Sequence, residues 1–183
     1  FEEARAGIYS VYLGLTGGSY VLAPEVQADA FNAVADFSNK YGELHRWTFE
    51  STNSTVETIW ANCYAAIGRA NFFIDGVGKI DENPEIELTE IQKQQINVYE
   101  GEAYFTRAYC YFYLATLFCR DYDVATAANT PGLPLQVKYE PKLAATQYPG
   151  RSSLEDTYKQ ILEDLEEAEV RIETAKNGIA DYD

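Results

Sequence analysis

The residues best suited to binding chemistry lie between Glu25 and Asn53. Aromatic rings alternate there with short polar side chains: Phe31, Phe37, Tyr41, Trp47 and Phe49 with Asp29, Asn32, Asp36, Asn39 and His45. A flat ring stacks on the apolar face of a sugar, while carboxylates and amides bind its hydroxyls. We therefore predict a carbohydrate site on Phe31, Asn32, Asp36, Phe37 and Tyr41, with Trp47 as a further contact. The alternative is that these aromatics pack beneath the loop, Trp47 and Phe49 above all.

The sequence shows no residue pattern typical of a catalytic site or a metal site. His45 is the only histidine and has no nucleophile motif beside it, so we expect no catalytic residue. Carboxylate pairs such as Asp29 and Asp36 are expected by chance among 29 acidic residues. The pairs at 121/123 and 181/183 lack the glycine and the distal glutamate of a calcium loop, so we expect neither a metal nor a cofactor.

Charge and cysteine content narrow the class of protein. The formal net charge of −15 argues against nucleic acid or an anionic membrane surface as a partner. Cys63, Cys110 and Cys119 are odd in number and lie in apolar helical runs, which predicts buried free thiols.

Helical patterns account for most of the chain. A first helix over residues 1–15 should end at Gly17-Gly18, and a short helix is possible over Glu25 to Asp36. Three capping boxes predict the starts of the long helices, and they are Ser54 with Glu57, Thr89 with Gln92, and Ser152 with Glu155. The first of these helices should close at Asp75-Gly76, and the second should run to about Arg120.

The stretch from Gly101 to Arg120 is apolar or aromatic on nearly every side, which predicts a helix buried all round. Its aromatic side chains would then be buried in the core. Arg107 within it, and Asn71 on the apolar face of the preceding helix, must find polar partners. We expect both to act as structural clasps, with Glu100 or Glu102 pairing with Arg107.

The last helix carries an apolar stripe opposite an acidic side. The stripe comprises Leu154, Tyr158, Ile161, Leu162, Leu165, Ala168 and Ile172, and the solvated side comprises Glu163, Asp164, Glu166, Glu167 and Glu169. No strand pattern of period two stands out. We therefore predict an all-α fold of paired helices with loosely tetratricopeptide-like spacing, and a long loop over residues 121–149.

Four stretches, taken in order and spacing, resemble the N-terminal region of SusD-like (RagB/SusD) proteins. They are Trp60–Asn71, Gly101–Leu114, Pro131–Leu135 and Gly150–Ala168. The resemblance implies an all-α, tetratricopeptide-like fold without catalysis. It also implies a lipid-anchored protein on the surface of the outer membrane, which binds oligosaccharide or another nutrient and passes it to a SusC-type TonB-dependent transporter.

The family's lipidated N-terminal cysteine and larger C-terminal region are not in this sequence. We therefore expect residues 1–183 to form one N-terminal helical domain of a longer protein. Two other classes stay open: a helical-toroid glycoside hydrolase, which would release reducing ends, and a tetratricopeptide scaffold, which would bind peptides and ignore sugars.

Overall fold

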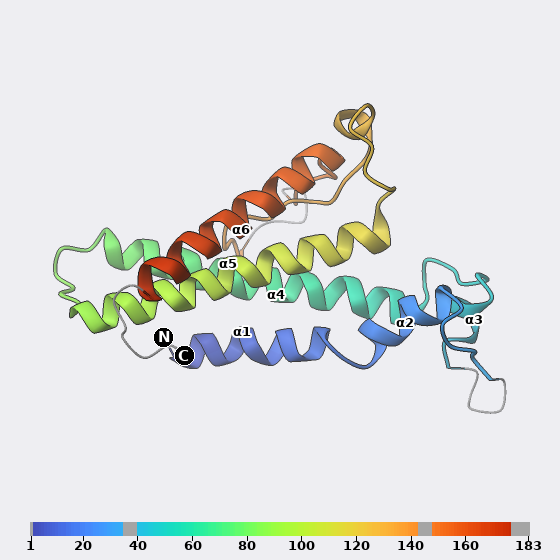
Figure 1. Cartoon of the computed structure of the whole chain (residues 1–183), viewed down its shortest axis with the longest axis horizontal. Coiled ribbons are helices and arrows are strands. Elements are labelled where there is room, and N and C mark those ends of the chain that lie inside the picture. The colour runs from blue at the N-terminus through green and yellow to red at the C-terminus, as the bar shows by residue number, and fades with distance from the viewer. Residues whose placement is uncertain (1, 35–39, 143–147, 177–183) are drawn as a thin grey trace.

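The computed structural model describes residues 2–34, 40–142 and 148–176, and its regular elements are helices (Figure 1). They are α1 (Glu2–Leu15), α2 (Ser19–Gln27), α3 (Gly42–His45), α4 (Ser54–Asp81), α5 (Glu90–Phe118), the 3-10 turn η1 (Ala127–Asn129) and α6 (Leu154–Lys176). The described residues form no strand, only one isolated bridge between Pro131 and Ser153. The all-α prediction is confirmed. None of the described helices combines the length and hydropathy needed to cross a bilayer.

The antiparallel helices α4 and α5 form the centre of the molecule (Figure 1). On one side α6 packs along α5, and on the other α1 packs against α4 and touches α5. The helices α2 and α3 pack together beyond the end of α1, and α2 also contacts α4. The main core lies where Cys63 and Ile67 of α4 meet Tyr111 and Leu114 of α5, all fully buried.

The start and end of α4 differ from the sequence prediction. Asn53, and not Ser54, is the N-cap, because its side-chain oxygen accepts the backbone N–H groups of Thr55 at 3.1 Å and Val56 at 3.3 Å. The predicted box of Ser54 with Glu57 is therefore wrong. The helix also runs through Asp75-Gly76 to Asp81, since packing in a long helix outweighs the local preference of one glycine.

Of the other two predicted capping boxes, the one at α5 is confirmed and the one at α6 is wrong. The capping box of Thr89 with Gln92 is present at the start of α5. At α6, Ser153 rather than Ser152 caps the helix, accepting the Asp156 N–H at 3.0 Å. The Ser152 hydroxyl is engaged elsewhere, because it donates to the Leu133 carbonyl at 2.7 Å.

The short helix lies earlier than predicted. It spans Ser19–Gln27 as α2 and not Glu25 to Asp36, and it holds Pro24 in its interior. Proline has no N–H to bond the carbonyl four residues back, which here belongs to Tyr20. The Tyr113 hydroxyl of α5 donates to that carbonyl instead. A tertiary contact thus satisfies the group that the proline leaves free, and the helix survives.

The helix α5 is not buried all round. Its small residues do face neighbours, because a Cβ on Gly101 would lie 3.1 Å from the Ala168 carbonyl oxygen of α6. Phe105 and Phe112, however, are 41% and 48% exposed. The expectation that the core consumes every aromatic of this helix is therefore wrong, because α4, α6 and α1 together leave one side of α5 uncovered.

The buried face of α6 is rotated relative to the predicted stripe. Thr157 and Asp164 are buried, whereas Leu162 and Leu165 are exposed. The predicted solvation of Asp164 is thus wrong, because hydrophobicity alone does not reveal a buried charge that has a partner.

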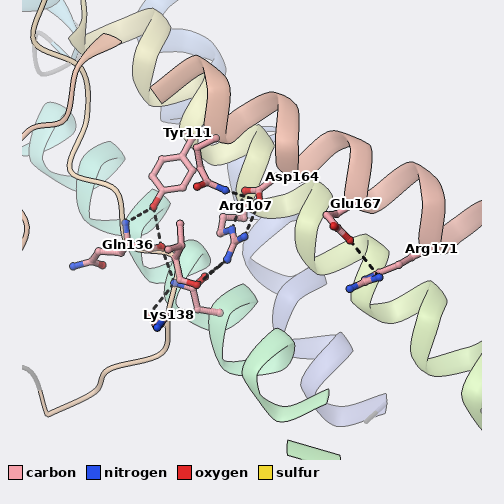
Figure 2. Close-up of polar contacts among 10 residues, drawn as sticks. Arg107, Tyr111, Gln136, Lys138, Asp164, Glu167 and Arg171 are labelled. Carbon is pink, nitrogen blue, oxygen red and sulfur yellow. Dashed lines mark hydrogen bonds and ion pairs between the residues drawn. The ribbon is translucent and has the colours of Figure 1, made fainter. Parts of the chain in front are cut away.

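That partner is Arg107 (Figure 2). Its Nε lies 2.8 Å from Asp164 Oδ2 and its Nη2 lies 2.6 Å from Oδ1, a bidentate pair with both side chains at most 5% exposed. Nη1 donates to Asn71 Oδ1 at 2.7 Å. Burial alone would lower the pKa of Arg107, but the bonded carboxylate raises it above its ordinary value. The clasp is confirmed, and its predicted partners are wrong: Glu100 pairs with Arg171 and Glu102 pairs with Arg5.

The clasp also fixes part of the long loop after α5. Asn71 Nδ2 donates to the Gln136 carbonyl at 2.8 Å, and Arg107 Nη1 donates to the Val137 carbonyl at 3.2 Å. The Tyr111 hydroxyl donates to the same Gln136 carbonyl at 2.9 Å. It also accepts a hydrogen bond from the backbone N–H of Gln136 at 2.7 Å. Buried side chains of α4 and α5 therefore hold an extended segment that has no secondary structure of its own.

The three cysteines are free, as predicted. Cys63 and Cys110 are buried and Cys119 is half-buried. A hydrogen bond with Cys63 and burial raise the pKa of the Cys110 thiol well above its ordinary value. Such thiols are inert and act as small apolar side chains.

Candidate functional site

The predicted binding segment lies at the end of the molecule where α2 and α3 pack together (Figure 1). The structure describes it except for residues 35–39, so Asp36 and Phe37 lie outside the described residues. Three non-glycine residues with positive φ fall in the described part of this segment: Asp29 at 58°, Tyr41 at 62° and Trp47 at 55°. Left-handed backbone at residues other than glycine is uncommon and gathers at functional sites.

Trp47 occupies a position at which helices usually place glycine. The N–H of Thr48 donates to the Glu43 carbonyl at 3.0 Å, and the N–H of Trp47 donates to the Leu44 carbonyl at 3.1 Å. These two bonds form a Schellman motif at the end of α3, in which the left-handed residue is Trp47. The motif turns the chain sharply and fixes the backbone that carries the indole.

A similar turn ends α2 close by. Asp29 is the left-handed residue there, and the Ala30 N–H donates to the Glu25 carbonyl at 2.9 Å. The two turns are tied together, because His45 Nδ1 lies 3.1 Å from the Val26 carbonyl oxygen. Leu44 of α3 is buried in the main core. The segment is therefore anchored at its base.

The indole of Trp47 is presented to solvent. The residue is 66% exposed, and its ring lies 6.2 Å from the half-buried ring of Phe49. Phe49 packs against the main core, so it supports the exposed ring from below. The expectation that both rings pack beneath the loop holds for Phe49 and is wrong for Trp47.

The other predicted contacts are arranged differently. Phe31 is 55% exposed and Asn32 is exposed as well. Tyr41 is half-buried against the main core, with its hydroxyl 2.9 Å from Ser19 Oγ and Lys40 Nζ 5.2 Å from its ring. Within the described residues no ring contact joins Phe31 to Trp47. The structure thus places one exposed ring on each of two anchored turns and does not bring them into contact.

The described part of the site presents exposed aromatic rings, and its histidine is held by neighbouring groups. His45 Nδ1 is engaged by Val26 and lies 3.7 Å from an exposed carboxylate oxygen of Asp29. Among the residues that the structure describes, no group of three or more histidine, cysteine or acidic side chains is placed to hold a metal ion.

Two features of the α2 and α3 end of the molecule were not predicted from the sequence. Val34, three residues after Phe31, is a further exposed apolar side chain at 58% exposure. The turn at Trp47 was also missed, because glycine is the usual signal for a Schellman motif and it is absent here. No local pattern replaces that signal.

Comparisons with a family model and a related sequence indicate the same family. Residues 18–174 match the model of a SusD-like family described as starch-binding and associating with the outer membrane. SusD-like protein P2 of Formosa agariphila is 29% identical over 118 residues, which are 61% of this chain and 22% of that protein.

Solved structures share the fold. A SusD superfamily protein from Bacteroides thetaiotaomicron aligns with a TM-score of 0.68 at 18% identity, over 93% of this chain and 37% of that chain. A SusD-like protein from Bacteroides fragilis aligns with a TM-score of 0.59 at 18% identity, over 90% and 28%. The chain therefore spans well under half the length of these relatives.

Proposed function

Since this chain belongs to the SusD-like family, whose model matches residues 18–174, we propose that it is part of a surface protein that captures an oligosaccharide. In this proposal a lipid anchor outside residues 1–183 holds the protein on the outer membrane. The protein then delivers its ligand to a SusC-type TonB-dependent transporter without cleaving it. The family description supports the coarser part of this function, starch binding and association with the outer membrane.

The observation that carries the proposal is the exposed indole of Trp47. A strained left-handed backbone costs about 1–3 kcal/mol, and a large apolar ring in water has no compensating burial. Trp47 nevertheless stands on a Schellman turn, 66% exposed and supported by Phe49. Such a ring is already positioned to stack on a sugar, so binding would cost little ordering entropy. Phe31 and Asn32 would add a second ring and an amide for hydroxyl groups.

The test is calorimetry of the full-length protein with a linear starch oligosaccharide and a panel of other glycans. Loss of one stacking contact of about 1.4 kcal/mol weakens binding about tenfold. We expect that loss for Trp47→Ala, and recovery of most of the affinity for Trp47→Phe. Tyr148→Ala is the matched control, because Tyr148 is a similarly exposed aromatic far along the chain. If Trp47→Ala binds every glycan as the parent does, the site does not use this ring.

The two other classes make different predictions in the same samples. A glycoside hydrolase would release reducing ends from the bound glycan, and a single carboxylate substitution would stop the release. A peptide-binding scaffold would bind no glycan of the panel. For delivery, we expect that deleting the gene lowers uptake of the bound oligosaccharide in cells that still contain the transporter.

A further inference from the structure

Asn53 lies where the chain leaves the loop that carries Trp47 and enters α4, and each of its polar groups is bonded. Its backbone N–H donates to the Glu50 carbonyl at 3.0 Å, and its own carbonyl accepts the Glu57 N–H at 3.0 Å. Its side-chain oxygen accepts two of the N–H groups that begin α4. Its side-chain amide donates to Glu43 Oε2 at 2.9 Å. Asn53 therefore joins the start of α4 to the loop before it and to α3.

The bond from Asn53 to Glu43 closes the loop 43–53, whose ends lie ten positions apart in the sequence. Glu43 contributes at both levels, because its side chain accepts the Asn53 amide and its backbone carbonyl accepts the Thr48 N–H of the Schellman turn. The residue that holds the turn at Trp47 is thus itself held to the start of α4.

The loop 43–53 needs such a bond for two reasons. Trp47 has a φ of 55°, and a left-handed backbone at a residue other than glycine persists only where its surroundings hold it. Apolar packing supplies little of that hold in the second half of the loop. Residues 46–52 are all described and all exposed except Phe49, which is half-buried. Segments with few buried contacts open easily, so the hydrogen bonds at the ends of the loop define where the indole lies.

Asparagine suits both tasks at this position, and the other common capping residues do not. Serine, threonine and aspartate also offer an oxygen to the first N–H groups of a helix. Aspartate has no donor for Glu43, and a hydroxyl has a single polar atom for both tasks. The amide of Asn53 has an acceptor for the helix and a separate donor for the carboxylate.

We propose that Asn53 is a positioning residue for Trp47: its amide holds the loop 43–53 closed, so that the exposed indole keeps one place before a ligand arrives. The effect on binding rests on the proposed function, since it requires a ligand that stacks on Trp47. The closure of the loop does not depend on that function. A ligand that meets an ordered ring loses less conformational entropy on binding, so it binds more tightly.

The test exchanges the donor and the acceptor of this bond in the full-length protein. Asn53→Asp keeps a good cap on α4, but it removes the amide donor and places two carboxylates together. Glu43→Gln keeps an oxygen acceptor for the Asn53 amide. The double variant Glu43→Gln, Asn53→Asp restores the bond in the reverse direction, because the new amide can donate to the new carboxylate. Restoration separates the role of this bond from the role of the helix cap.

Hydrogen exchange of the Trp47 and Thr48 amides reports opening of the turn without any ligand. Loss of the bond should speed this exchange about fivefold in Asn53→Asp. Glu43→Gln and the double variant should exchange as the parent does. The Cys63 amide in the buried part of α4 is the internal control and should exchange alike in every variant. Calorimetry with the linear starch oligosaccharide should show binding weakened by about threefold or more in Asn53→Asp, and recovered in the double variant.

Three results would overturn the proposal. They are exchange at Trp47 and Thr48 that Asn53→Asp leaves unchanged, exchange that stays as fast in the double variant as in Asn53→Asp, and faster exchange with unchanged affinity for the oligosaccharide. A parent protein that binds no glycan would refute the proposed function instead, and the exchange rates would still decide whether Asn53 holds the loop closed.

Discussion

Replacing Asp164 by alanine should destabilise this protein more than any substitution at its surface. The change removes two charge-assisted hydrogen bonds and leaves the guanidinium of Arg107 in a site where its side chain is 5% exposed. Water has little access to that group, and its described partners are then Asn71, the Val137 carbonyl and the ring of Tyr104. Removing one member of a buried ion pair costs about 3–5 kcal/mol.

The magnitude follows from burial, and a second ion pair provides the control. Arg5 and Glu102 form the same bidentate contact at 2.6 Å, but the Arg5 side chain is 34% exposed. Water can solvate Arg5 after the carboxylate is removed, so we expect Glu102→Ala to cost about 1 kcal/mol or less. Both pairs are bidentate, and the Arg5 pair is much more accessible to water than the Arg107 pair.

The assay is urea unfolding followed by far-ultraviolet dichroism at neutral pH. A loss of about 4 kcal/mol changes the unfolding equilibrium constant about a thousandfold. The double variant Arg107→Met, Asp164→Leu should recover most of the loss, because it leaves no buried charge without a partner. Equal costs for Asp164→Ala and Glu102→Ala would refute the reasoning, since they would mean that water reaches the Arg107 site.

Two further predictions concern a helical glycine and a buried acid. Gly101→Ala should destabilise the protein by about 1–3 kcal/mol, because its methyl would lie 2.8 Å from Ile172 Cγ1. Gly68→Ala should stabilise the protein by about 0.5–1 kcal/mol, because nothing lies within 4 Å of the added methyl. Thermal unfolding of both variants measures the two effects. Burial raises the pKa of Glu100, so its contribution to stability is present below its ordinary value of 4.5 and is lost as pH rises through the raised folded-state value. Stability measured against pH should therefore fall less over that window in Glu100→Gln than in the parent.

Local chemistry determined much of the helical framework. The capping box of Thr89 with Gln92, and the apolar repeats that follow it, fix the start of α5 wherever the rest of the chain lies. The requirement that Arg107 and Asn71 find partners also follows from sequence, since a polar group on an apolar face is costly unless it is bonded. The aromatic content of residues 25–53 likewise marked the region in which Trp47 stands exposed.

Only the tertiary structure decided which groups meet. Asp164 looked like one of many acids on a solvated face, and its pairing with Arg107 depends on how α6 is rotated against α5. Pro24 is tolerated inside α2 because a hydroxyl from α5 reaches the Tyr20 carbonyl. Trp47 is exposed because a Schellman turn without glycine aims it outward, and Phe112 because no described helix covers that side of α5. The turn at Trp47 is local but has no glycine to signal it. The other three outcomes depend on residues distant in sequence, and a pattern along one helix carries no information about its neighbours in space.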